Sequence, residues 1–406
     1  MRILIVTQYF YPENFKSNDI AFEMVKKGHQ VDVLCGIPNY PQGKYYKGHG
    51  VFSKRKENIK GVNVYRSFQF PRGKGGRLRL MVNYLSYVIS ASLYILFFFS
   101  FKKYDCTIVH EVSPIFQAYP ALLLKKIKKI PMYLWVLDLW PDAMMSGGGI
   151  KNKSLLSFVN KLVCNIYRHS DKILISSRRF RDSITTKGDF DKKIEYFPNW
   201  SDDMLFPLKK TVNSIPQLPS GFKIMLAGNL GKSQNLEAVM ETILELRNIS
   251  NLKWLFLGDG TKKKWLDDFI EENDLKGTVS AMGRYPADMM PAFFEKADAL
   301  LLTLKSGFPH LKMVVPARLQ TYMSSAKPIL GMIDGGAVDI IKEAKCGFTV
   351  PAGDSKALAE TIKQKVLTDL ETWSDMGKNG RKYYTNNFTK EICINNLEKI
   401  LIKITK

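Results

Sequence analysis

Titratable side chains occur at the ends of apolar strands, where they could act on a bound substrate. His110 and Glu111 lie at the end of one predicted strand, and Asp138 lies at the end of the next. A carboxylate at a strand tip can accept a hydrogen bond from a substrate hydroxyl or act as a weak base. The structural alternative is that Asp138 and Asp142 cap a turn and that His110 is a core residue.

Glycines follow two apolar strands in the second half of the chain. The loop 228–231 begins and ends with glycine, and Gly258 and Gly260 come after the next predicted strand. Glycine lets the backbone approach an anion, and the start of the following helix, expected over 236–247, favours negative charge. One such loop is explained equally well as a tight turn. Two in one domain favour a pocket for a nucleotide diphosphate.

Strands and helices alternate along the chain in two series, a pattern typical of parallel sheets covered by helices on both faces. Four prolines in 198–221 indicate a linker between the series. We predict an α/β protein of two doubly wound, Rossmann-like domains that face each other across a ligand-binding cleft. The expected strands are 2–7, 30–35, 62–67, 105–110, 132–137, 172–176, 193–197, 223–227, 253–257, 279–282, 299–303, 328–331 and 348–350.

The charge of the chain is unevenly distributed. Its 406 residues include 60 Lys and Arg against 38 Asp and Glu, a formal net charge of +22. Residues 1–200 hold 32 of the basic and 14 of the acidic residues, so this half carries +18 and should face an anionic partner. The five cysteines lie far apart, which excludes a disulfide framework or zinc site and fits a reducing cytoplasm. The apolar run 2–6 is too short for a signal peptide.

An uncharged segment in the basic half could contact a membrane. Residues 80–101 form a stretch of 22 residues without a charge, long enough to cross a hydrocarbon core of about 30 Å as a helix. Residues 44–79 carry eleven Lys and Arg against one acid, which suits an anionic lipid surface. Three interpretations stay open: a helix dipping into one leaflet, a helix buried in the domain, and a helix that spans the bilayer.

Short motifs occur across nearly the whole chain. They are Tyr9-Phe-Tyr-Pro-Glu13, Gly28-His29, Pro38-Asn-Tyr-Pro41, Asp138-Leu-Trp-Pro-Asp142, Pro198-Asn-Trp200, Ala227-Gly-Asn-Leu-Gly231 with Gln234, Gly258-Asp-Gly260, Tyr322-Met323, Lys327-Pro328 and Pro351-Ala-Gly-Asp354. These motifs are specific in this order rather than singly, and together they resemble those of retaining glycosyltransferases of the GT-B fold, family 4. Within that family the resemblance is to the branch that adds fucose-like or N-acetylated deoxysugars in capsule and O-antigen assembly.

The resemblance implies roles for individual residues. In such enzymes a histidine near the donor sugar matches His110, and the loop after the first strand reaches the sugar and the acceptor. The implied catalytic residues are His110, Asp138 and Glu111; the implied acceptor-side residues are Glu13, Lys16, Ser17, Asn18 and Asp142; and the implied donor-binding residues are Gly228, Asn229, Leu230, Gly231, Lys232, Gln234, Gly258, Gly260, Arg284, Lys312, Arg318 and Thr321.

The chain departs from the wider family at several of these positions. Where many members carry two glycines in the first loop, this chain has Lys16-Ser-Asn18. The usual pair of glutamates is absent, since 299–333 contains no Asp or Glu, and Thr321 stands at the second position. In the branch named above, a basic residue in a Pro-Ser-Lys triplet begins that helix, and here the triplet reads Pro316-Ala-Arg318. The guanidinium of Arg318 suits two adjacent phosphate oxygens.

No metal is expected in the site. The formal DxD sequence at 189–191 lies among lysines between a helix and a strand, which indicates a surface turn. Arg318 would stabilise the leaving diphosphate in place of Mg²⁺.

The expected enzyme moves a sugar, without a cofactor, from a nucleotide diphosphate to a lipid-linked saccharide at the cytoplasmic membrane face. UDP is favoured over GDP as the nucleotide. The resemblance also implies domains over 1–200 and 201–387, with a last helix in 388–406 packing back on the first. Two alternatives are a nucleotide-sugar 2-epimerase of the same fold and a non-catalytic basic module that binds membrane or nucleic acid. The glycine-rich strand ends argue against nucleic acid as a partner.

Overall fold

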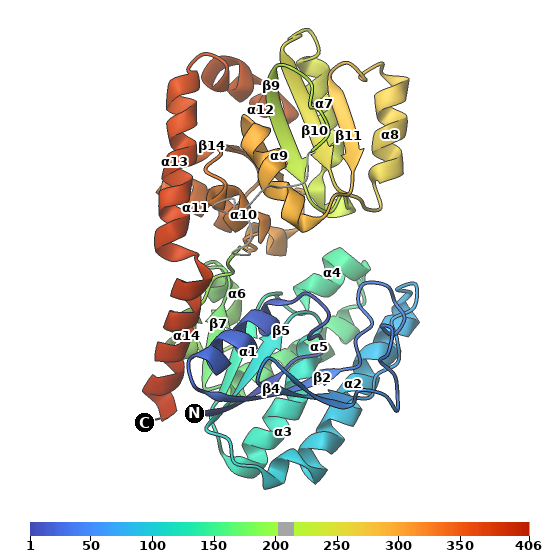
Figure 1. Cartoon of the computed structure of the whole chain (residues 1–406), viewed down its shortest axis with the longest axis vertical. Helices are drawn as coiled ribbons and strands as arrows, with labels where there is room; N and C mark the ends of the chain where they lie inside the picture. Colours follow the sequence, from blue (N-terminus) through green and yellow to red (C-terminus); the bar gives the residue numbers. More distant parts are fainter. Residues whose placement is uncertain (202–214, 406) are drawn as a thin grey trace. The chain divides into compact units, whose positions relative to one another are not determined.

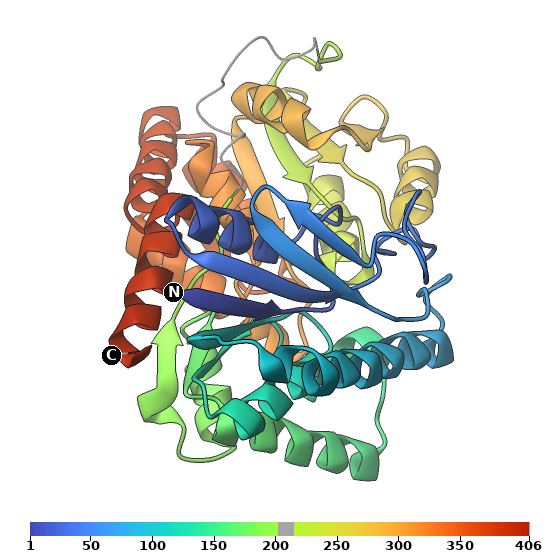
Figure 2. The same ribbon diagram turned by 60° about the horizontal axis from the view of Figure 1, so that its bottom comes forward.

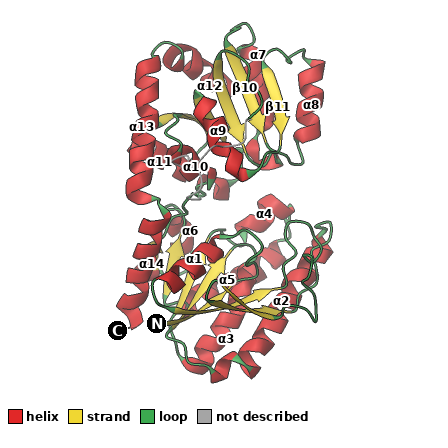
Figure 3. Cartoon of the chain, in the orientation of Figure 1, coloured by secondary structure: helices red, strands yellow, loops and turns green. Residues whose placement is uncertain are grey.

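A computed structural model describes residues 1–201 and 215–405, which fold as two compact units (Figure 1). The N-unit comprises Met1–Phe197 and the chain from Ile394 onward, and the C-unit comprises Pro198–Cys393. Part of the predicted linker, 202–214, lies outside the described residues. Each unit contains a sheet with helices on both of its faces (Figure 3).

The N-unit sheet has the strand order β3-β4-β2-β1-β5-β6-β7-β8 and is parallel except for β3 at its edge. Sequence analysis did not predict β3, because three of its four residues, Lys-Glu-Asn, are polar and the strand is only partly buried. The strands are β1 Arg2–Val6, β2 Gln30–Gly36, β3 Lys56–Ile59, β4 Val62–Ser67, β5 Cys106–Glu111, β6 Met132–Val136, β7 Lys172–Ile175 and β8 Ile194–Tyr196.

The helices of the N-unit connect these strands and cover the sheet. Figure 2 shows α1 on one face of the sheet and α2 on the other. The helices are α1 Lys16–Lys26, α2 Arg77–Phe97, α3 Tyr119–Lys128, α4 Asp142–Gly148, α5 Lys153–His169, α6 Phe180–Thr185 and α14 Lys390–Thr405, with short 3-10 turns at Phe99–Phe101, Ile115–Ala118 and Asp191–Lys193.

The C-unit sheet is parallel and has the strand order β11-β10-β9-β12-β13-β14. Its strands are β9 Phe222–Ala227, β10 Leu252–Leu257, β11 Val279–Gly283, β12 Ala299–Thr303, β13 Ile329–Met332 and β14 Gly347–Val350. Its α-helices are α7 Leu236–Glu245, α8 Lys263–Glu272, α9 Met290–Lys296, α10 Arg318–Ser324, α11 Gly336–Ala344, α12 Ser355–Thr361 and α13 Leu370–Asn387. The C-unit also has 3-10 turns at η4 Lys232–Gln234, η5 Ala287–Met289 and η6 Pro309–Lys312, and a π-turn at η7 Ile362–Val366.

Both sheets are doubly wound, as predicted, and the reason lies in their strand composition. Strands such as β6 and β12 are buried along their whole length, which is the pattern of parallel strands covered on both faces. In each sheet the strand order reverses beside the first strand, at β1 and β5 in the N-unit and at β9 and β12 in the C-unit. Ligands of doubly wound sheets bind where the carboxyl ends of such strands separate.

The last helix, α14, packs on the N-unit. The hydroxyl of Tyr133 donates to the carbonyl oxygen of Leu401 at 3.1 Å. The carboxylate of Glu398 accepts a hydrogen bond from Lys27 Nζ and contacts His29 Nε2, both at 2.8 Å. The N-unit is therefore built from the two ends of the chain.

Candidate functional site

The two glycine-rich loops of the C-unit touch through their backbones. Gly228 follows β9 with φ of +127°, and Gly258 follows β10 with φ of +145°, a conformation that favours glycine. A Cβ atom at Gly258 would lie 1.8 Å from the carbonyl oxygen of Gly228. The amide of Leu230 donates to the carbonyl oxygen of Asp259 at 2.9 Å and joins the loops further on. Glycine is thus required at these strand ends by loop-to-loop packing.

Arg318 lies against this pair of loops. A Cβ atom at Gly228 would be 3.3 Å from Arg318 Nη2, so the guanidinium covers the glycine backbone. Tyr322, one helical turn later, holds α10 in place, because its hydroxyl accepts a hydrogen bond from the amide of Ala227 at 2.9 Å. Arg318 Nη1 is buried and has no hydrogen-bond partner among the described residues. A cation with an unused donor beside exposed backbone is suited to a phosphate oxygen.

Other predicted donor-binding residues near these loops have structural contacts. Asn229 lies beside Gly260, where a Cβ atom would be 2.6 Å from Asn229 Oδ1. Gln234 is buried, and its carbonyl oxygen accepts a hydrogen bond from Thr303 Oγ1 at 2.6 Å, which ties the loop to β12. Thr321 is half-buried on α10, three residues after Arg318.

The other predicted cations of the C-unit are Lys232, Arg284 and Lys312, and they lie in more exposed surroundings than Arg318 does. Lys312 is 57% exposed and lies 3.6 Å from a carboxylate oxygen of Asp334. Both line a cavity of about 10 Å³ beyond the ends of β12 and β13, which has room for about one water molecule. Lys232 directly follows Gly231, Arg284 directly follows β11, and both are exposed. Among these predicted cations, Arg318 is the one whose side chain lies against Gly228 in the described part of the chain.

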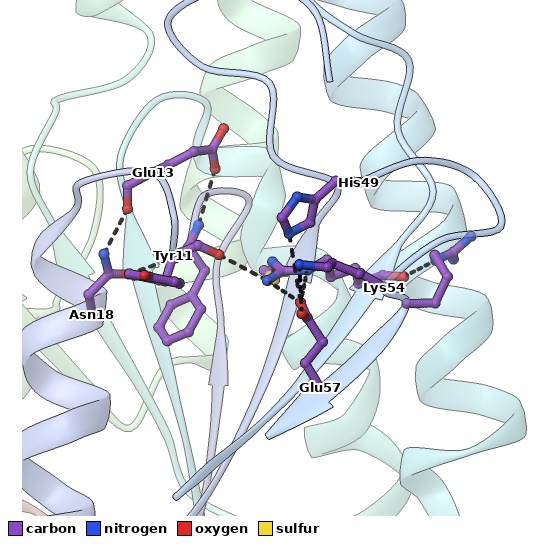
Figure 4. Close-up of polar contacts among 10 residues, drawn as sticks. Tyr11, Glu13, Asn18, His49, Lys54 and Glu57 are labelled. Carbon is purple, nitrogen blue, oxygen red and sulfur yellow. Dashed lines mark hydrogen bonds and ion pairs between the residues drawn. The ribbon is translucent and has the colours of Figure 1, made fainter. Parts of the chain in front are cut away.

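In the N-unit, Glu13 organises the loop that follows β1. Its Oε1 accepts hydrogen bonds from the amides of Asn39 at 2.8 Å and Tyr40 at 2.7 Å, and its Oε2 accepts one from Phe10. These bonds favour the ionised carboxylate, but burial outweighs them and raises the pKa of Glu13 to about 7. Figure 4 shows Glu13 beside Asn18, whose amide group donates to the carbonyl oxygen of Glu13 at 2.7 Å.

Glu13→Gln is expected to change the pH dependence of stability. Between pH 4.5, the ordinary pKa, and pH 7 the folded chain keeps a proton that the unfolded chain releases. The free energy of unfolding of the wild type therefore falls as pH rises through this interval, and glutamine removes that contribution. The difference between the two proteins should change by up to about 3 kcal/mol. Urea denaturation at several pH values measures it, and a difference independent of pH would contradict the raised pKa.

The other predicted acceptor-side residues hold the same loop. Ser17 is buried and donates from Oγ to the carbonyl oxygen of Tyr9 at 3.2 Å. Asn18 Oδ1 accepts a hydrogen bond from the amide of Tyr11 at 3.0 Å. Lys16 begins α1 and lies 3.7 Å from a carboxylate oxygen of Asp19. The side chains of Glu13, Ser17 and Asn18 therefore hold the backbone of the loop in place. It is this backbone, rather than the three side chains, that could contact a ligand.

A buried ion pair fixes this loop to the sheet edge, as Figure 4 shows. Arg66 on β4 is 1% exposed, and its Nη2 donates to the carbonyl oxygen of Tyr11 at 3.0 Å and to Glu57 Oε2 at 2.9 Å. His49 Nε2 and Lys54 Nζ each lie 3.7 Å from the same carboxylate. Sequence analysis missed this cluster, because the residues grouped with Arg66, at positions 49, 54 and 57, come from the polar strand β3 and the loop before it.

His110, the next-to-last residue of β5, lies in a buried aromatic cluster. Its ring centroid lies 5.0 Å from that of Trp135 and 6.5 Å from that of Phe15. Neither ring nitrogen has a hydrogen-bond partner among the described residues. Burial, with a smaller contribution from Lys16, lowers the pKa of His110 to about 3, so the ring is neutral near pH 7. A neutral imidazole can bond a substrate hydroxyl, but it has no second proton to give.

Parallel pairing of β5 with β6 brings the two predicted carboxylates together. Glu111 is fully buried, and burial together with the charge of Asp138 holds its pKa well above the ordinary range. Asp138 is partly exposed, and its Oδ2 accepts a hydrogen bond from Ser113 Oγ at 2.6 Å. Of the two carboxylates, Asp138 is the one that a substrate can reach, whereas the buried Glu111 accepts a hydrogen bond from the backbone of Asp138. Asp142 begins α4, as the first residue of that helix.

An aromatic and cationic group beside this loop was not predicted. The hydroxyl of Tyr9 accepts a hydrogen bond from Arg72 Nη1 at 2.9 Å, and the Arg72 guanidinium lies 5.0 Å from the ring centre of Tyr40. The ring of Phe15 stacks on that of Tyr9 at 4.9 Å. Tyr9 and Tyr40 belong to motifs noted in the sequence. No pattern in the sequence pairs them with Arg72, which comes from the segment between β4 and α2.

Helix α2 carries apolar side chains on both its inner and its outer face. Tyr87, Ala91 and Ile95 are buried against the N-unit. Two polar residues also bond to the protein: Asn83 is buried and donates to the carbonyl oxygen of Phe70, and Ser86 Oγ accepts a hydrogen bond from the amide of Phe70 at 3.0 Å. Its outer face is apolar, with Ile89 62% and Phe97 76% exposed. We call this face the apolar stripe; it comprises Leu78, Met81, Leu85, Ile89, Leu93, Leu96 and Phe97.

The length of α2 also bears on a membrane. Among the described residues, the segment Arg77–Phe101 is the one that meets the length and composition of a membrane-crossing helix, and 22% of its most apolar window is buried. Core helices of soluble proteins pass the same test when they are mostly buried. Here most of that window is exposed, although Ala91 and Ile95 are buried.

The formal DxD sequence lies away from the residues described above. Asp191 begins a 3-10 turn before β8 and forms an ion pair with Arg181 of α6, which agrees with the predicted surface turn.

Comparisons with known proteins find relatives that cover parts of both units. Residues 213–383 match the model of the family "Glycosyl transferases group 1". The putative colanic acid biosynthesis glycosyl transferase WcaI of Escherichia coli K12 is 27% identical over 342 residues, which cover 80% of this chain and 81% of WcaI. The chain is a glycosyltransferase. A second relative, the putative colanic acid biosynthesis glycosyltransferase WcaL of the same organism, is 22% identical over 180 residues, or 44% of each chain.

Solved structures of glycosyltransferases share the fold over the whole chain, which confirms the predicted GT-B architecture. HepE from Anabaena, in complex with UDP, superposes with a TM-score of 0.70 at 14% identity and covers 99% of this chain and 100% of its own. Sucrose-phosphate synthase from Thermosynechococcus elongatus superposes with a TM-score of 0.72 at 14% identity, covering 99% and 98%. At these identities the likeness concerns the fold alone.

Proposed function

We propose that this glycosyltransferase transfers an N-acetylated deoxysugar from a UDP-linked donor to a saccharide carried on a polyprenyl diphosphate at the cytoplasmic membrane face. The observation that supports a lipid-linked acceptor is helix α2, whose apolar stripe is exposed beside the most basic part of the chain. A contiguous exposed apolar face marks a surface that contacts a membrane or another protein, and the basic residues beside it favour a membrane. The names of WcaI and WcaL support a role in building a cell-surface polysaccharide.

The C-unit would bind the donor. The backbones of the loops at Gly228 and Gly258 would lie against the diphosphate, and Arg318 would pair with its oxygens through the unused Nη1. UDP in the complex of HepE supports UDP over GDP as the nucleotide. We expect no metal requirement, because the guanidinium itself supplies positive charge to the leaving diphosphate.

The N-unit would supply the groups around the sugar and the acceptor. In the proposed reaction the bond from the sugar C1 to the diphosphate breaks, and a bond from C1 to the acceptor oxygen forms on the same face, so the configuration is retained. The proton of the acceptor hydroxyl passes to a leaving phosphate oxygen. Neutral His110 would hydrogen-bond a sugar hydroxyl, and Asp138 would orient the acceptor hydroxyl.

The membrane would be bound by α2 and its basic surroundings. The apolar stripe would enter one leaflet while the Lys and Arg residues of 44–79 meet anionic headgroups, at roughly 1 kcal/mol for each charge near the surface. A helix lying in the interface suits α2 better than one that spans the bilayer, because its inner face is hydrogen-bonded to the N-unit.

A transfer assay tests the proposal. The purified enzyme would be incubated with a panel of UDP- and GDP-sugars and a synthetic polyprenyl-diphosphate saccharide, with and without a chelator, and products read by mass spectrometry. We expect one added deoxysugar residue from a UDP donor, an unchanged rate with the chelator, and retained configuration by NMR. Calorimetry with each nucleotide sugar is the companion measurement. No product and no binding with any donor would refute the proposed function.

A further inference from the structure

Two loops of the N-unit line an open cavity of about 470 Å³ that none of the roles above uses. One loop, 40–43, follows β2, and the other, 72–75, precedes α2. The volume lies within the range of about 300–1,000 Å³ that small-molecule sites occupy.

The backbones of the two loops touch at their glycines. The amide of Gly73 donates to the carbonyl oxygen of Gly43 at 2.8 Å. Gly43 has φ of +76°, and a Cβ atom there would lie 1.9 Å from the carbonyl oxygen of Gly73. Any side chain at position 43 would force the loops apart, so the shape of the cavity depends on this glycine.

The walls of the cavity carry positive charge in a fixed position. Arg72 is held by three contacts: its amide donates to Asn39 Oδ1 at 3.0 Å, its Nη1 donates to the hydroxyl of Tyr9, and its guanidinium lies over the ring of Tyr40. Lys74 is a second cation in the lining, and the lining residues include no carboxylate. A preorganised arginine with a nearby lysine suits a ligand rich in phosphate oxygens.

The cavity also adjoins the apolar stripe. Gly75 lines the cavity, α2 begins at Arg77, and Leu78 is the first residue of the stripe. A ligand with its phosphate in the cavity could therefore extend a hydrocarbon chain along α2 into a membrane. A nucleotide offers no such chain.

We propose that this cavity binds the diphosphate of the lipid-linked acceptor, with Arg72 and Lys74 as its anionic-oxygen ligands. This inference rests on the proposed function and names the part of the N-unit that holds the acceptor. The two phosphates would lie at the level of the lipid headgroups, which leaves the attached saccharide free to reach the loop after β1.

Binding of a short-chain acceptor to the full chain tests the site without a membrane. The probe is a synthetic farnesyl-diphosphate N-acetylhexosamine, titrated by calorimetry below its micelle concentration. Arg72→Gln with Lys74→Gln should lower its affinity at least 30-fold, and Gly43→Ala should lower it comparably. The control Lys161→Gln with Lys192→Gln removes the same charge from exposed positions of the N-unit and should leave affinity unchanged. Inorganic pyrophosphate should displace the probe from the wild type.

The thermal unfolding temperature of each variant, measured in parallel, separates loss of the site from loss of the N-unit fold, and its affinity for the UDP-sugar shows whether the C-unit is intact. Unchanged probe affinity in the Arg72 and Lys74 variant would overturn the proposal. So would a loss of binding to anionic vesicles with probe affinity intact, because the cavity would then take phospholipid headgroups. Failure of the wild type to bind the probe while it still transfers sugar to another acceptor would overturn this inference alone. Transfer to no acceptor would refute the proposed function instead.

Discussion

Arg318→Ala is expected to weaken binding of the UDP-sugar donor by about 100-fold. The guanidinium lies against Gly228, and its Nη1 has no partner among the described residues, so its unused hydrogen-bonding capacity is directed to a ligand. Charge-assisted hydrogen bonds contribute roughly 1.5–3 kcal/mol each, which corresponds to a loss of one to two orders of magnitude in affinity. Isothermal titration calorimetry with UDP and with the UDP-sugar measures the effect.

Two further variants define the role of Arg318. Arg318→Lys keeps the charge but loses the planar pair of donors, and we expect an intermediate affinity. Lys264→Ala removes a cation of the C-unit that is 86% exposed on α8, and the affinity for donor should not change. An unaltered donor affinity in Arg318→Ala would remove this residue from the site and leave the diphosphate to the loop backbones.

Ile89→Asp with Leu93→Asp should release the enzyme from anionic liposomes. Both residues lie on the apolar stripe and are about half exposed or more, so the substitutions disturb little of the internal packing. Burial of one such side chain contributes roughly 1.5–3 kcal/mol, so the pair should lower the partition coefficient more than 100-fold. Flotation on a sucrose gradient measures the bound fraction.

The controls for the stripe separate its contributions. Ile89→Ser with Leu93→Ser adds no negative charge and should still lower binding strongly, because the apolar contribution is lost. Leu370→Asp changes an apolar residue of the C-unit that is 54% exposed and should leave flotation unchanged. If the double aspartate variant floats as the wild type does, α2 does not enter the membrane.

Much of the fold could be predicted because buried parallel strands are recognisable in the sequence as continuous apolar runs. Each predicted strand is present with its ends shifted by at most a residue or two, and β4 and β12 begin and end as predicted. β3 was missed since half of it faces solvent and its sequence has no apolar run. Hydrophobic patterning finds strands that are covered on both faces and passes over a charged edge strand.

The candidate site was predictable only where topology alone brings residues together. Gly228 and Gly258 end neighbouring parallel strands, and Glu111 and Asp138 do the same, so their proximity follows from the strand order. The contact of Arg72 with Tyr9 and Tyr40 depends on loop conformations that no periodicity describes. The face of α2 that turns toward the N-unit could not be predicted either, because it depends in part on hydrogen bonds to the segment after β4.

The N-unit is assembled from segments that precede and follow the C-unit in the sequence, which has a consequence for its biosynthesis. The ribosome makes β1 before the C-unit and α14 after it, so the N-unit is begun before the C-unit and completed after it. Until α14 is made, Tyr133 and His29 lack the contacts that this helix provides. A premature stop codon after Cys393 would therefore disrupt the N-unit, although the codon lies beyond the C-unit sequence.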